Sequence, residues 1–179
     1  MRNTKPPLLF WILHAGWAIF GVNDWWPRVA SASLSFAGVL LTARLARRLW
    51  PGPLTLVLPL LPGSGIDRAS TAGGDLAAIR APRGFAHELI ARLDLPLAMP
   101  SANRSGRISP TSARHVLDDL GADLSLIVDA GPAEIGVEST VVRVRPDGID
   151  ILRAGVITPD QSAMAAGFDL HDVAASGGD

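Results

Sequence analysis

The residues best suited to chemistry lie together at positions 99–111, in the run Met-Pro-Ser-Ala-Asn-Arg-Ser-Gly-Arg-Ile-Ser-Pro-Thr. This run holds four hydroxyl groups, one amide and two guanidinium groups. It leads from a predicted strand into a predicted helix, so its backbone N–H groups and the helix start suit an anion such as phosphate. The alternative is a polar loop in which Ser109 or Thr111 caps the helix and Arg104 and Arg107 are solvated.

A second candidate segment is 136–140, Gly-Val-Glu-Ser-Thr, where a glycine enters a predicted strand and a carboxylate and two hydroxyls follow. Such a segment suits a small polar ligand. Taken alone, it fits equally well a surface Glu138 followed by ordinary strand residues at Ser139 and Thr140.

Two arginines, Arg80 and Arg153, each end a predicted strand. An arginine there can bind a carboxylate or phosphate through two hydrogen bonds, although a solvated surface arginine is the commoner outcome. The sequence contains no phosphate-binding GxxxxGK[ST] loop and no GxGxxG after a strand, so the common nucleotide-binding folds are not indicated. The four histidines have no metal-ligand spacing.

The composition predicts a folded, apolar domain. The chain has 179 residues, 48% of them hydrophobic and 18% charged, which fits one globular unit. The absence of cysteine excludes disulfides and thiolate metal sites and makes a cytoplasmic setting the default. Residues 51–179 hold ten arginines and sixteen acids, a balance of −6, so they exert no general attraction on nucleic acid.

The first fifty residues differ from the rest, with six Lys/Arg against one acid and all five tryptophans. Residues 8–22 are almost wholly apolar, but fifteen residues fall short of the ~20 of a membrane-spanning helix. Three interpretations are open: a membrane anchor or signal, a buried part of the core, or a start that is not native because of truncation or a shifted reading frame. The tryptophans and the change of charge favour the third.

The hydrophobic pattern predicts alternating strands and helices. The predicted helices are 42–50, 85–93 and 111–120, and the predicted strands are 54–61, 76–81, 95–99, 124–129, 139–144 and 149–153. Pro-Asp-Gly at 146–148 joins the last two strands as a hairpin. We therefore expect an α/β (α+β) fold whose sheet contains at least one antiparallel pair.

Taken together, five segments resemble the YrdC-like family of threonylcarbamoyl-AMP synthases in order and spacing, over residues 43–157. They are 50–55, 78–82, 100–106, 136–140 and 152–155. The resemblance divides the chain into a non-family or aberrant segment 1–42, an incomplete YrdC-like domain 43–160 and a flexible tail 161–179. It also implies a twisted mixed sheet with flanking helices and a large concave, positively lined cavity.

The resemblance implies a cytoplasmic nucleotidyltransferase that condenses L-threonine, bicarbonate and ATP, with Mg²⁺, to threonylcarbamoyl-AMP and pyrophosphate. The product would serve N6-threonylcarbamoyladenosine formation at position 37 of tRNA, through a downstream tRNA-modifying transferase. The positions that resemble ATP-contacting residues are Ser101, Asn103, Ser109 and Arg153. The positions that resemble threonine-contacting residues are Arg80, Met99 and Ser139. No residue is assigned a catalytic or metal-binding role, since catalysis would rest on positioning and charge stabilisation.

The chain also departs from the family pattern. Asn103 belongs to the Ser-x-Asn half of a KxR…SxN signature, but Lys5 is the only lysine and Pro-Pro follows it. Leu76 stands where the family often has an ATP-contacting threonine. The alternative function is therefore a catalytically impaired member that binds nucleotide or double-stranded RNA. Membrane tethering through residues 8–22 is a third, less favoured possibility.

Overall fold

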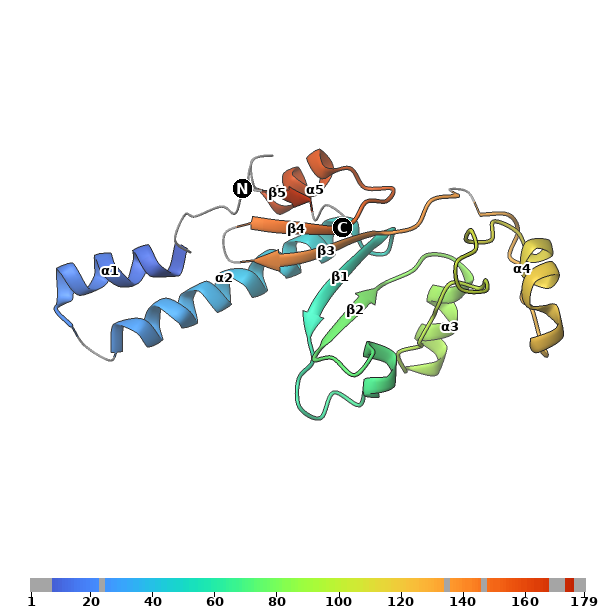
Figure 1. Ribbon diagram of the computed structural model, residues 1–179, viewed down its shortest axis with the longest axis horizontal. Helices are drawn as coiled ribbons and strands as arrows, with labels where there is room; N and C mark the ends of the chain where they lie inside the picture. The colour runs from blue at the N-terminus through green and yellow to red at the C-terminus, as the bar shows by residue number, and fades with distance from the viewer. Residues whose placement is uncertain (1–7, 23–24, 134–135, 146–147, 168–172, 176–179) are drawn as a thin grey trace.

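A mixed sheet of five strands is the centre of the computed structural model, which describes residues 8–22, 25–133, 136–145, 148–167 and 173–175 (Figure 1). The strands are β1 (Leu54–Pro59), β2 (Leu76–Arg80), β3 (Thr140–Arg145), β4 (Gly148–Arg153) and β5 (Val173–Ala175). Their order across the sheet is β2-β1-β3-β4-β5. Pairs β1–β3 and β4–β5 are parallel, and β1–β2 and β3–β4 are antiparallel.

Helices flank this sheet and extend beyond it (Figure 1). They are α1 (Leu8–Phe20), α2 (Trp25–Leu49), α3 (Phe85–Leu93), α4 (Ala113–Leu120) and α5 (Pro159–Ala166), with short 3₁₀ turns η1 (Arg68–Thr71) and η2 (Gly121–Asp123). The arrangement confirms the predicted α/β class and the β3–β4 hairpin. The large concave cavity stays a prediction.

The core lies between the sheet and the C-terminal part of α2 together with α5. Its fully buried aliphatic side chains come from three strands and one helix: Leu54 and Leu56 of β1, Val142 of β3, Ile149 of β4 and Leu45 of α2. Burial of each such side chain stabilises the fold by roughly 1.5–3 kcal/mol. This core fixes the relative positions of β1, β3 and β4, the strands at whose ends the candidate site lies.

Two predicted strands, 95–99 and 124–129, are wrong. Neither segment forms a ladder in the structure, and their apolar side chains are exposed, with Leu95 63% and Leu126 79% accessible. A strand needs hydrogen bonds from a neighbour, and among the described residues neither segment is paired into the sheet. The predicted strands at β1–β4 and the helix 85–93 are confirmed, and the helix 111–120 is confirmed from residue 113.

The predicted flexible tail from residue 161 is also wrong at its start. Residues 161–166 belong to α5, where Ala163, Ala165 and Ala166 are buried. Thr158 caps this helix by accepting a hydrogen bond from the Gln161 backbone N–H, and the Gln161 side chain accepts one from the Thr158 backbone N–H. This capping box and the buried alanines make the segment part of the core.

At the other end of the chain, the predicted boundary at residue 42 falls inside α2. The helix predicted over 42–50 is the last part of a helix that begins at Trp25. Helix α1 packs beside it, because Gly16 leaves room for the Trp26 indole, whose Nε1 donates to the Ile12 carbonyl at 3.1 Å. By length and composition α2 could cross a membrane, a test that core helices and signal sequences also pass. Leu45 of α2 is buried against the sheet, but only 12% of the candidate span is buried.

Candidate functional site

The guanidinium of Arg153, at the end of β4, is the centre of the site. Its Nε donates to the Ser139 carbonyl at 3.1 Å and its NH2 donates to Ser139 Oγ at 2.9 Å. Its NH1 forms an ion pair with Glu138 Oε2 at 2.6 Å. The antiparallel pairing of β3 with β4 places Arg153 opposite Val141, and this register brings the arginine to the residues just before β3.

Two further residues extend this contact set into a line of polar groups. Glu138 Oε1 accepts a hydrogen bond from Ser109 Oγ at 2.9 Å. On the other side, the buried Ser139 hydroxyl shares a 2.8 Å hydrogen bond with Thr55 Oγ1 of β1. We call Thr55, Ser139, Arg153, Glu138 and Ser109 the Arg153 cluster.

Arg80, at the end of β2, lies next to this cluster. In the β1–β2 ladder Arg80 is the partner of Thr55, and its Nε donates to the Gly52 carbonyl at 2.9 Å. Burial lowers the pKa of the Arg80 guanidinium, and the positive charge of Arg153 lowers it further. Two like charges near each other favour a bound anion, which would stabilise both.

Gly155 allows two backbone segments to approach each other closely beside the cluster. A Cβ at Gly155 would lie 2.4 Å from the Glu138 carbonyl oxygen and 2.5 Å from Thr140 N, so only glycine fits there. Thr140 itself is buried and exchanges hydrogen bonds of 2.9 Å with the backbone of Ile157. The segments 136–140 and 152–155 singled out in the sequence are therefore in direct contact.

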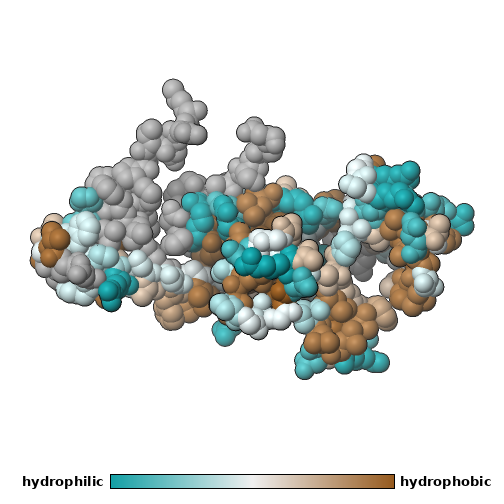
Figure 2. Space-filling view, turned by 60° about the horizontal axis from the view of Figure 1, so that its bottom comes forward, coloured by the Kyte–Doolittle hydropathy of each residue, from teal (hydrophilic) through white to brown (hydrophobic). Residues whose placement is uncertain are grey.

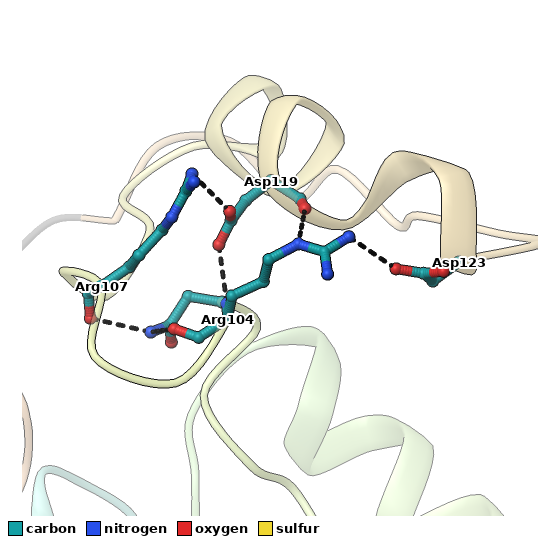
Figure 3. Close-up of polar contacts among 5 residues, drawn as sticks. Arg104, Arg107, Asp119 and Asp123 are labelled. Carbon is teal, nitrogen blue, oxygen red and sulfur yellow. Dashed lines mark hydrogen bonds and ion pairs between the residues drawn. The ribbon is translucent and has the colours of Figure 1, made fainter.

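The loop before α4 is held by ion pairs, as Figure 3 shows. Arg104 donates from its backbone N to Asp119 Oδ2 at 2.7 Å and from its NH2 to Asp123 Oδ2 at 2.9 Å. Arg107 NH1 lies 2.7 Å from Asp119 Oδ1. Asn103 Nδ2 donates to the carbonyls of Arg104 and Arg107, at 3.0 and 2.9 Å. The two arginines thus pair with Asp119 and Asp123, while their side chains stay 55% and 66% exposed, as the polar-loop alternative expects.

The structure brings together part of the predicted site. Ser109, Ser139 and Arg153 belong to one cluster, with Arg80 beside it. Among the described residues, the remaining candidates, Ser101, Asn103 and Met99, form no hydrogen bond or ion pair with that cluster, and Met99 is 52% exposed. The binding roles of all seven candidates stay predictions. Ser112 caps α4 by accepting from His115 N at 3.3 Å, so the cap predicted at Ser109 or Thr111 is wrong.

Sequence reasoning did not assign two members of the cluster, Glu138 and Thr55. Glu138 was noted only as a candidate within 136–140, and the signal for Thr55 was a lone hydroxyl in an otherwise apolar strand. Among the described residues, no group of three or more His, Cys, Asp or Glu side chains is placed to hold a metal ion. A hollow of about 410 Å³ lies against α2 and α5 and contains none of the site candidates.

The fold and the site together define a mixed α/β protein in which two arginines, Arg80 at the end of β2 and Arg153 at the end of β4, lie close enough to repel each other. A profile of the Sua5/YciO/YrdC family, described as telomere recombination, matches residues 39–155. The chain therefore belongs to this family, and residues 1–38 lie outside the match. The recognition made from the five segments is confirmed.

Known relatives agree with this assignment. A threonylcarbamoyl-AMP synthase of Bacillus subtilis is 48% identical over 124 residues, which are 69% of this chain and 36% of that protein. One from Pyrococcus abyssi is 46% identical over 115 residues, 62% of this chain and 32% of that protein. The crystal structure of P. abyssi Sua5 complexed with L-threonine superposes with a TM-score of 0.68 at 39% identity, covering 75% of this chain and 38% of the other. The chain thus spans about a third of the length of these curated relatives.

Proposed function

We propose that this chain carries the anion-binding part of an L-threonylcarbamoyladenylate synthase, which converts L-threonine, bicarbonate and ATP to threonylcarbamoyl-AMP and pyrophosphate. The observation that carries the proposal is the Arg153 guanidinium. Ser139 holds two of its nitrogens, and the third pairs with Glu138, which also accepts a hydrogen bond from Ser109. Relatives named threonylcarbamoyl-AMP synthase, at 41–48% identity, support it.

In this proposal each arginine binds one anionic group. Arg153 and Ser109 donate hydrogen bonds to phosphate oxygens of ATP, and Arg80 pairs with the threonine carboxylate. The carbamate oxygen of N-carboxythreonine attacks the α-phosphorus, the bond to the bridging oxygen breaks, and pyrophosphate leaves with the electron pair. The positive charges stabilise the charge that develops on the phosphates. Magnesium enters as part of the ATP complex.

The other predicted contacts belong to the same proposal. Ser101 and Asn103 would meet ATP, and Met99 and Ser139 would meet threonine. The product would pass to a tRNA-modifying transferase in the cytoplasm, and the tRNA itself would bind to that transferase complex. These partners are proposed from the family relationship, because nothing on the described surface recognises them individually.

The test is release of pyrophosphate by the purified chain supplied with Mg-ATP, L-threonine and bicarbonate. We expect release that depends on threonine. The substitution Arg153→Gln should raise the KM for ATP about tenfold or more, since a charge-assisted hydrogen bond contributes ~1.5–3 kcal/mol. Arg80→Gln should raise the KM for threonine instead. Arg114→Gln is the matched control, because Arg114 is 76% exposed and pairs only along its own helix.

A second candidate is nucleotide binding without turnover. It is favoured by the lack of a Lys-x-Arg sequence at Lys5. Calorimetric titration with ATP separates the two: binding without pyrophosphate release supports this candidate, and binding with release supports the synthase. Double-stranded RNA binding would show as a salt-dependent affinity, against which the −6 balance of residues 51–179, ten arginines and sixteen acids, argues.

A further inference from the structure

The Glu138 carboxylate binds the two donors, Arg153 NH1 and Ser109 Oγ, that the proposed function assigns to a phosphate of ATP. Its Oε2 lies 2.6 Å from Arg153 NH1 and its Oε1 lies 2.9 Å from Ser109 Oγ. A carboxylate therefore already fills the anion position between these two donors. A phosphate group presents the same pair of acceptor oxygens, and two anions cannot share these donors without strong repulsion.

Arg153 does not depend on Glu138 for its position. Its Nε and NH2 are held by the carbonyl and hydroxyl of Ser139, and Ser139 is itself buried and tied to Thr55. The third nitrogen, NH1, is the one that faces Glu138. The guanidinium thus stays aimed at the anion position when the carboxylate leaves.

Glu138 is free to leave, in contrast. Its side chain is 43% exposed and that of Arg153 is 45% exposed, so solvent reaches the ion pair and an outward rotation of Glu138 restores its hydration. An ion pair this exposed is weak. It is weak enough for a phosphate carrying more negative charge to replace it.

We propose that Glu138 holds the place of an ATP phosphate group at Arg153 and Ser109 and is displaced when the phosphate binds. The inference rests on the proposed function in taking ATP as the source of the phosphate. Glu138 thereby sets the affinity for phosphate. Its carboxylate satisfies Arg153 and Ser109 in the free protein and lowers the apparent affinity for phosphate by competition.

The alternative role, a permanent brace between β4 and the loop, predicts the opposite effect. Removing a brace loosens Ser109 and Arg153 and weakens anion binding. Removing a competitor strengthens it. The sign of the change therefore decides between them.

The experiment is an NMR titration of the full chain with inorganic pyrophosphate, which needs neither threonine nor turnover. We expect Glu138→Gln to bind pyrophosphate about two- to fivefold more tightly than the unchanged chain, which is what an exposed ion pair contributes. Glu138→Ala, which also removes the hydrogen-bond acceptor, should do the same. Glu88→Gln on α3 is the matched control for loss of a glutamate charge, and its affinity should stay unchanged.

A double-substitution cycle separates local competition from a general change of charge. In an Arg153→Gln background, Glu138→Gln should no longer improve binding, because the competing pair is already gone. An equal improvement in both backgrounds, an unchanged or weaker affinity of the Glu138 variants, or no pyrophosphate binding by any of these proteins would overturn the proposal. Failure of the proposed function would appear separately, as binding of pyrophosphate without its release from ATP.

Discussion

At the scale of single residues, the site combines polar groups that the sequence keeps far apart. Thr55 and Ser139 are 84 positions apart and Ser109 and Glu138 are 29 apart. Residue types and local spacing could single out Ser109, Ser139 and Arg153 as candidates. They could not reveal the hydrogen bond between Ser109 and Glu138, because it depends on how the loop before α4 and the β3–β4 hairpin meet in space.

Gly155 should be essential for the close contact between the segments 136–140 and 152–155. We expect Gly155→Ala to destabilise the fold by about 1–3 kcal/mol, since its Cβ would overlap the Glu138 carbonyl and neighbouring backbone. Urea denaturation measures the change. The same substitution at Gly38 in α2, where nothing lies within 4 Å, should instead stabilise the protein by up to ~1 kcal/mol. Equal effects at the two glycines would contradict the close contact.

At the scale of elements, the structure shows what periodicity can and cannot predict. Helix α3 follows Gly84 and repeats its apolar residues at helical spacing, so its bounds are predicted from sequence. The segments 95–99 and 124–129 have the alternation of strands, but among the described residues neither is paired into the sheet, and strand formation requires such pairing. The start of α2 was missed because residues 25–41 are rich in Ala, Ser and Leu and carry no clear helix face.

The loop 101–107 and helix α4 form a unit through Asp119. This carboxylate is 11% exposed, and it accepts the Arg104 backbone N–H and pairs with Arg107. We expect Asp119→Ala to cost about 1–3 kcal/mol and to speed hydrogen exchange at the Arg104 amide. Asp118→Ala, next along the helix, removes only an exposed pair with Arg114 and should change stability by less than ~0.5 kcal/mol. Equal exchange rates in the two variants would show that Asp119 does not hold the loop.

At the scale of the whole molecule, α3 and the segment that follows it expose large apolar side chains. Brown areas in Figure 2 mark apolar residues on this face of the molecule. Phe85 and Leu93 of α3 and Leu95 and Leu97 of the following segment are each 38–63% exposed. Strand β2 is also an edge of the sheet. Exposed apolar patches and unpaired edges commonly mediate association.

We therefore expect the purified chain to self-associate as its concentration rises. Sedimentation velocity should show the weight-average mass increasing with concentration, and Leu93→Lys should reduce this increase by placing a charge on the patch. Arg92→Lys, the neighbouring substitution that keeps the charge, is the control. A mass that does not change with concentration in the unchanged chain would rule out association through this surface.

The length of chain between the partners in the Arg153 cluster also sets an order of events in folding. The β3–β4 hairpin closes a short loop and brings Arg153 to Ser139 across 14 positions, whereas the parallel β1–β3 pairing joins residues as distant as Leu54 and Thr140. Contacts between distant residues form late because closing a long loop costs more entropy. We therefore expect the hairpin contact of Arg153 with Ser139 to form before the β1–β3 pairing that brings Thr55 to Ser139. A phosphate bound at Arg153 and Ser109 should then slow unfolding while leaving the rate of hairpin formation unchanged.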